Sequence, residues 1–258
     1  MNTVQRKAED TGRCAHTQAP PPAAPLGVLC STCFGMDPSL PGSPDRCEVH
    51  RLDCLVFTRR VKKGGALYHQ GDPFEFIHGV RSGTFKSALD LRDGREHVTG
   101  FQMAGELLGL DALAMGRHAS SAVALENAET WAIPYARLSD PAATSPALHH
   151  AISRMMSREI VRDHGLMLLL GTMNAEERLA VFLLNISRRL QARGYSPSEF
   201  HLRMSRAEIG SYLGMKVETV SRAFSTFQQE GLLSVAKKHV SMLDLDGLGR
   251  KLASDWVH

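Results

Sequence analysis

The stretch RAEIGSYLGMKVETVSRA, residues 206–223, constrains this chain most, because its spacing predicts two helices joined by a tight turn. Gly210 permits the two helices to approach closely. Gly214 falls where the turn needs a positive φ, which glycine adopts at low cost. The residues at inward-facing positions are small or apolar: Ile209, Leu213, Met215, Val220 and Ala223. The sequence therefore predicts a helix-turn-helix unit.

The second predicted helix presents a polar face. Glu218, Ser221 and Arg222 recur at i, i+3 and i+4 and so share one side of the helix. A guanidinium fork, a carboxylate and a hydroxyl can recognise base edges in the major groove of DNA. The alternative is an ordinary helical hairpin with a solvated polar face. The residues predicted to contact DNA are Glu218, Ser221, Arg222, Thr219, Lys216 and Arg206.

Positive charge is concentrated around this unit. Residues 188–238 hold nine Lys and Arg against four Glu, whereas the net charge of the whole 258-residue chain is +3. Such a basic segment is what binding to DNA phosphates requires. No nucleophile–base set, phosphate loop or metal-protease motif is present, so a DNA-binding protein is favoured over an enzyme or an enzyme with a DNA-binding tail.

The rest of the chain divides into segments of different composition. Residues 1–28 are polar and rich in Pro and Ala and are expected to be disordered, and residues 29–54 hold four of the five cysteines. Over residues 55–145 short apolar runs alternate with turn signals, among them Asp93-Gly94, a strong hairpin cue. We therefore predict an α+β protein with an N-terminal antiparallel β-barrel or jelly roll and a C-terminal winged helix-turn-helix domain over 174–258.

Between these domains, residues 146–173 are assigned to a long dimerisation helix. A four-then-three spacing typical of a coiled-coil seam runs through Met156, Ile160, Asp163, Met167 and Leu170. The alternative is a helix packed on its own barrel, but its length favours a homodimer. Asp163 would be repelled by its mate in such a seam. Either the seam is rotated or dimerisation is deliberately weak.

The chain lacks an apolar signal core and any run long enough to span a membrane, so we expect a cytoplasmic protein with no membrane partner. An odd number of cysteines, five, argues against a disulfide framework in that compartment.

The order of parts resembles the CRP/FNR family of bacterial transcription regulators, and its FNR branch most closely. The resemblance covers about residues 29–250 and is carried by TGFQMAGELLGLDAL (99–113), NAEERLAVFLLNISRRL (174–190), residues 193–222 and GLLSV (231–235). It implies a cyclic-nucleotide-binding-like β-roll and a homodimer. It also implies that the Glu-x-x-Ser-Arg motif of Glu218, Ser221 and Arg222 binds TTGAT-like inverted repeats. RNA polymerase would be a partner at the hairpin around Gly94, although Arg95 stands where relatives carry an acid.

The same resemblance bears on the sensed signal. CRP-like members hold cyclic AMP with an Arg-Ser pair that follows a Gly-Glu-Leu segment. Here Gly105-Glu106-Leu107 is present, but the later stretch HASSA (118–122) has no arginine, and Arg117 is misplaced. Because a buried phosphate needs a cationic partner, cyclic AMP is not expected.

FNR-like members hold an oxygen-labile iron–sulfur cluster with four cysteines, and this chain departs from that pattern. Cys30 and Cys33 match the first pair, but Ser39 and Trp131 stand at the third and fourth positions.

Other residues in the N-terminal segment could take the place of the two missing cysteine ligands. Cys47 and Cys54 follow, and Cys30-x2-Cys33 with Cys47-x2-His50 resembles a zinc spacing. Four alternatives therefore stay open: no metal, a [4Fe–4S] cluster, zinc, or an oxidation-sensitive thiol pair. Without a cluster, the barrel could instead sense a metabolite, or DNA binding could be constitutive.

Overall fold

The structure is a computed structural model that describes residues 57–138 and 146–252. The candidate metal ligands fall outside this part of the chain. They are Cys30, Cys33, Cys47, Cys54 and His50. Ser39, which stands at the expected position of the third cysteine, also falls outside it.

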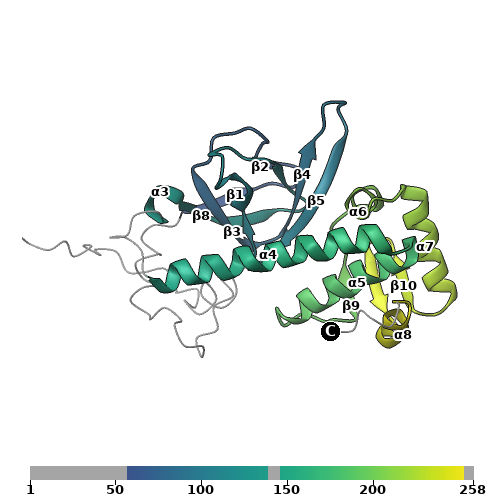
Figure 1. The fold of residues 1–258 in the computed structure, drawn as a ribbon. Coiled ribbons are helices and arrows are strands. Elements are labelled where there is room, and N and C mark those ends of the chain that lie inside the picture. The colour runs from purple at the N-terminus through teal and green to yellow at the C-terminus, as the bar shows by residue number, and fades with distance from the viewer. Residues whose placement is uncertain (1–56, 139–145, 253–258) are drawn as a thin grey trace, which may run out of the picture.

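The N-terminal module is an antiparallel jelly roll, as the alternation of short apolar runs and turn signals predicts (Figure 1). Its first sheet has the order β1-β8-β3-β6 and its second the order β2-β7-β4-β5. Val80 and Phe85 have no exposed surface and lie in its core. The strands are β1 (Phe57–Val61), β2 (Ala66–Tyr68), β3 (Phe76–Ser82), β4 (Thr84–Asp90), β5 (Glu96–Met103), β6 (Leu107–Leu108), β7 (Ser121–Ala124) and β8 (Ala128–Pro134).

Three short features complete this module. The predicted Asp93-Gly94 turn joins β4 to β5, with Gly94 at a φ of 81° and the N–H of Leu91 donating to the carbonyl of Arg95. A 3-10 turn, η2 (Leu110–Ala112), follows β6, and the helix α3 (Tyr135–Leu138) follows β8.

The helix α4 (Pro146–Thr172) runs from the roll to the C-terminal module, as predicted (Figure 1). Met155 and Leu169 are buried on the side that faces the chain itself, whereas Met156, Ile160 and Met167 are 36%, 54% and 68% exposed.

The other two residues of the predicted seam differ in burial. Asp163 is exposed, but Leu170 packs partly against the C-terminal core. In a straight helix, residues repeated every seven positions rotate by about 20° per heptad around the helix axis. Leu170, the last residue of the predicted seam, is therefore rotated toward the packed face of α4.

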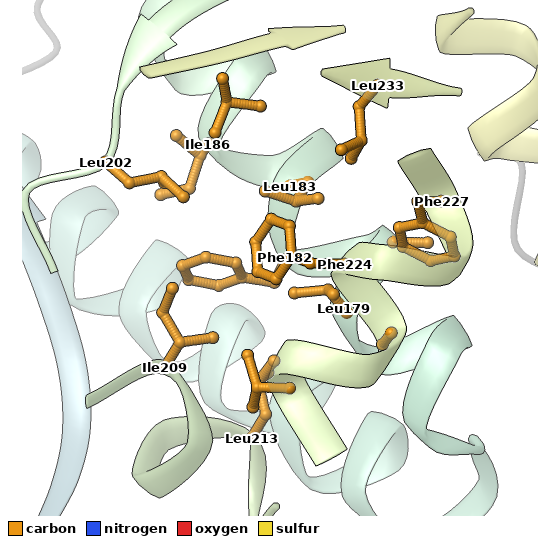
Figure 2. Close-up of a cluster of buried hydrophobic side chains, with 14 of the residues drawn as sticks. Leu179, Phe182, Leu183, Ile186, Leu202, Ile209, Leu213, Phe224, Phe227 and Leu233 are labelled. Atoms are coloured by element: carbon orange, nitrogen blue, oxygen red, sulfur yellow. The ribbon is translucent and has the colours of Figure 1, made fainter. Parts of the chain in front are cut away.

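The C-terminal module is a helix-turn-helix with a three-stranded wing of order β10-β11-β9. Figure 2 shows its core, in which side chains of α5, α6 and α7 meet those of the wing. Its elements are α5 (Ala175–Gln191), β9 (Glu199–His201), α6 (Arg206–Leu213), α7 (Val217–Gln229), β10 (Leu233–Ala236), β11 (His239–Met242) and α8 (Leu245–Arg250). Among the described helices, none is long and apolar enough to cross a membrane.

Candidate nucleic-acid interface

Local signals in the sequence form the helix-turn-helix. Ser205 and Glu208 make a capping box at the start of α6, with the N–H of Ser205 donating to the Glu208 carboxylate at 2.7 Å. Gly214 ends the helix at a φ of 62°. A Cβ on Gly210 would lie 2.6 Å from the carbonyl oxygen of Met215, so only glycine fits where the turn crosses the helix.

The predicted inward-facing set packs as expected. Ile209, Leu213 and Val220 are fully buried, Ala223 is 4% exposed, and Met215 is partly buried against the same core. Figure 2 shows Phe224 and Phe227 of α7 beside Leu179 and Leu183 of α5. This packing fixes α7, the predicted recognition helix, against α5 and α6, so its opposite side faces outward.

The outward side carries most of the predicted DNA-contacting residues. Glu218, Ser221 and Arg222 are exposed, Lys216 is exposed at the N-terminus of α7, and Thr219 is half-buried. The hydroxyl of Ser221 donates to the carbonyl of Val217 at 2.9 Å, which leaves the hydroxyl oxygen as an acceptor. The structure thus places a donor fork, a carboxylate and a hydroxyl within one stretch of the helix.

Arg206 lies apart from this face. Its guanidinium carbon is 3.1 Å from the ring centroid of Phe224, and one terminal nitrogen is buried without a hydrogen-bond partner. Burial lowers the pKa of Arg206 to about 10. The side chain therefore packs on α7 as a cation–π partner instead of standing beside Arg222. Sequence spacing gives no sign of this, because Phe224 is 18 positions away.

Part of the basic charge of residues 188–238 is used within the protein. Arg189 and Arg193 both pair with Glu106 in the jelly roll. Arg203 pairs with Glu126 at 3.1 Å. Some of the basic residues that suggested DNA binding therefore form ion pairs that join the two modules.

Two residues take positions that their spacing in the sequence did not predict. Lys237 is exposed at the turn between β10 and β11, with a φ of 59°, and its charge lies at the tip of the wing. Arg178 donates from its guanidinium to the carbonyl oxygens of Leu170, Met173 and Leu213, and so joins the ends of α4 and α6.

The jelly roll contacts the helix-turn-helix directly. The Nζ of Lys86 lies 3.3 Å from the carboxylate of Glu208, and the N–H of Val98 donates to the Oγ of Ser211 at 2.9 Å. Strand β5 of the roll therefore supports α6, the first helix of the helix-turn-helix.

A cavity of about 310 Å³ lies between the roll and α4. The carboxylates of Asp111, Glu159 and Asp163 line it, and its arginine, Arg162, pairs with Glu159. Ser120 donates to Asp111 from both its N–H and its hydroxyl. Three acidic groups around one paired arginine oppose the binding of a cyclic phosphate.

Other residues that the resemblance singled out lie outside this cavity. Arg117 is exposed and donates to the carbonyl of Gly71. Trp131, at the expected position of the fourth cysteine, is buried in β8 with the guanidinium of Arg81 5.7 Å from its ring centroid. Over residues 57–138 and 146–252, no three His, Cys, Asp or Glu side chains gather as a metal site.

Comparison with known proteins agrees with this architecture. The model of the Crp-like helix-turn-helix domain matches residues 177–251, and that of the cyclic nucleotide-binding domain matches residues 58–144. The chain is 43% identical over 235 residues to the transcriptional regulatory protein btr of Bordetella pertussis, covering 91% of this chain and 97% of that protein.

Two further comparisons point the same way. The chain is 40% identical to the fumarate and nitrate reduction regulatory protein of Escherichia coli, over 86% of this chain and 90% of that one. The solved structure of FixK2 from Bradyrhizobium japonicum superposes with a TM-score of 0.70 at 29% identity, covering 77% of this chain and 98% of FixK2.

Proposed function

This chain belongs to the CRP/FNR family of DNA-binding transcription regulators, not to an enzyme family, and we propose that it binds a TTGAT-like inverted repeat as a homodimer in response to the redox or oxygen status of the cytoplasm. The exposed Glu218, Ser221 and Arg222 on α7 carry this proposal. Arg222 bonds the O6 and N7 of a guanine, Glu218 accepts from an exocyclic amine, and Ser221 accepts from a base or contacts a thymine methyl.

Exposed apolar residues on α4 support the homodimer. Met156, Ile160 and Met167 are exposed, and Val161 and Leu168 are 66% and 49% exposed, while Met156 and Ile160 also border the cavity beside the roll. An apolar stripe of this kind on a long helix favours pairing with a second copy. A two-fold dimer would present two recognition helices to the two halves of an inverted repeat.

The name of the Escherichia coli relative, the fumarate and nitrate reduction regulatory protein, supports a signal connected with the reduction of fumarate and nitrate. The resemblance alone suggests RNA polymerase as a partner at the tip of the β4–β5 hairpin. Asp93 and Arg95 pair with each other there at 2.6 Å, and Arg92 beside them is exposed.

The described residues do not fit a four-cysteine iron–sulfur cluster. The indole nitrogen of Trp131 has no free lone pair for iron, and the residue is only 9% exposed. A cluster would therefore need replacement ligands such as Cys47, Cys54 and His50, and without a cluster redox sensing would fall to cysteine thiols. A second candidate is a metabolite-sensing regulator, which the cavity between the roll and α4 favours, because a bound ligand there would contact the predicted dimer helix.

The test of DNA recognition is the variant Arg222→Ala. Loss of a bidentate guanine contact costs about 1–3 kcal/mol, roughly a 5- to 150-fold weaker Kd for the inverted repeat. Fluorescence anisotropy with the repeat, and with a probe in which the guanine is replaced, measures both affinity and selectivity. Arg188→Ala, an exposed arginine on α5, is the matched control. If Arg222→Ala keeps full, guanine-selective binding, the assignment is wrong.

The test of the signal is anaerobic purification followed by iron, sulfide and zinc analysis and a visible spectrum. About four irons and four sulfides per chain would support a cluster with replaced ligands, and Cys47, Cys54 and His50 would be the residues to change. Colourless, metal-free protein that still binds the repeat would direct attention to thiol chemistry or to a ligand in the cavity.

A further inference from the structure

Two histidines face each other on the outer side of the wing. His201 of β9 stands directly opposite His239 of β11 in the antiparallel register, and their Nδ1 atoms are 3.3 Å apart. The alternate residues, Phe200 and Val240, point into the core and are 7% and 0% exposed. The histidine pair is therefore on the solvent side of the sheet, and core packing does not account for it.

The separation of the two nitrogens matches the bite of a tetrahedral metal ion. Zinc binds histidine nitrogen at about 2.0–2.1 Å, and two such bonds at the tetrahedral angle hold their nitrogens about 3.3 Å apart. The pair thus has the spacing of a chelate before any metal enters.

A neighbouring hydroxyl can accept a hydrogen bond from the tautomer that a metal needs. The Nε2 of His239 lies 3.4 Å from the Oγ of Ser241, two residues further along the same strand. When Nε2–H donates to this oxygen, the proton occupies Nε2 and the Nδ1 lone pair is free. Outer hydrogen bonds of this kind commonly orient metal-binding histidines.

Two of the cations that line the neighbouring hollow interact with other groups, and Lys63 also lines it. The Nζ of Lys238 donates to the carbonyl of Arg203 at 2.9 Å, and the guanidinium of Arg203 pairs with Glu126. His201 borders a hollow of about 250 Å³ between the wing and the roll, which has room for water molecules. Since the described residues supply no third His, Cys, Asp or Glu ligand, water would complete the coordination.

We propose that His201 and His239 form a two-histidine site for a divalent transition metal of the Zn²⁺, Ni²⁺ or Cu²⁺ type. Neutral imidazole suits these ions, and affinity rises from Ni²⁺ to Cu²⁺ in the usual order. The metal joins the edge strand β9 to β11. Because β9 leads within four residues to the capping residue Ser205 of α6, the metal stabilises the wing next to the DNA-recognition unit.

The test uses the full chain with its cysteines alkylated, because all five cysteines precede residue 57 and would bind zinc themselves. The protein is freed of metal with EDTA, exchanged into buffer, and titrated with Zn²⁺ while its Tm is recorded. His201→Gln and His239→Gln each remove one ligand. His97→Gln, which changes an exposed histidine on β5, is the matched control.

We expect Zn²⁺ to raise the Tm of the unmutated chain and of His97→Gln, and to leave the Tm of both pair variants unchanged. A rise of equal size in the pair variants would overturn the site. Ring signals of the unmutated chain in ¹H–¹⁵N spectra supply a measurement that needs no variant. Zn²⁺ must shift the signals of His201 and His239 together, and unshifted signals mean that the pair is only a hydrogen bond.

Discussion

Replacing Glu106 by Gln tests how the jelly roll and the DNA-binding module are held together. The Glu106 carboxylate accepts from the Nε of Arg189 at 3.0 Å, from a terminal nitrogen of Arg193 and from the N–H of Met103 at 3.0 Å. The three charged side chains are only 13–17% exposed. Gln keeps the shape but removes the charge, leaving two largely buried guanidinium groups without their counter-ion.

The expected loss is large. Breaking a buried ion pair by removing one partner costs about 3–5 kcal/mol, because the remaining charge stays desolvated. Urea unfolding at neutral pH, followed by tryptophan fluorescence and by circular dichroism, measures this loss. Arg60→Ala is the control, since Arg60 pairs with Glu129 but is 83% exposed. That change should cost less than about 1 kcal/mol.

The stability lost in Glu106→Gln should also depend on pH. Burial alone would raise the pKa of Glu106, but Arg189 and Arg193 outweigh burial and hold that pKa below its ordinary value. A carboxyl group whose pKa is lower in the folded state than in the unfolded state stabilises the fold. This contribution is complete above about pH 5. It is lost as the pH falls through the ordinary carboxyl pKa of about 4.3 and then through the lower folded-state pKa. The stability difference between the unmutated chain and Glu106→Gln should therefore shrink below about pH 5. A difference under about 1 kcal/mol at neutral pH, or one independent of pH, would refute the reasoning.

Two further changes test the dimer and the turn. Asp163→Ala should strengthen the predicted dimer by about 1 kcal/mol, roughly fivefold, because it removes a like-charge repulsion across the seam; equal monomer–dimer constants by ultracentrifugation would contradict this. Gly210→Ala should cost about 1–3 kcal/mol and weaken DNA binding, because its Cβ would lie 2.6 Å from the backbone oxygen of Met215. Gly249→Ala, whose Cβ meets nothing within 4 Å, should be neutral or slightly stabilising in thermal unfolding, and similar losses for both would reject the steric explanation.

The sequence alone was enough for the helix-turn-helix and for the hairpin. Ile209, Leu213 and Val220 recur at inward-facing positions, Gly214 ends α6 at a positive φ, and Gly94 turns a hairpin between adjacent strands. These signals act between near neighbours, so their spacing in the sequence already fixes their geometry. The same holds for the period that placed the long helix α4.

The tertiary structure decided what the charged and titratable residues do. Arg189 meets Glu106 across 83 positions, His201 meets His239 across 38, and Arg206 turns onto Phe224 instead of the outward face. No local spacing encodes these contacts, because they depend on how a helix crosses a sheet and on strand register. Charge along the sequence therefore indicated a basic DNA-binding segment, but only the folded chain separates Arg222, which faces outward, from the arginines that hold the protein together.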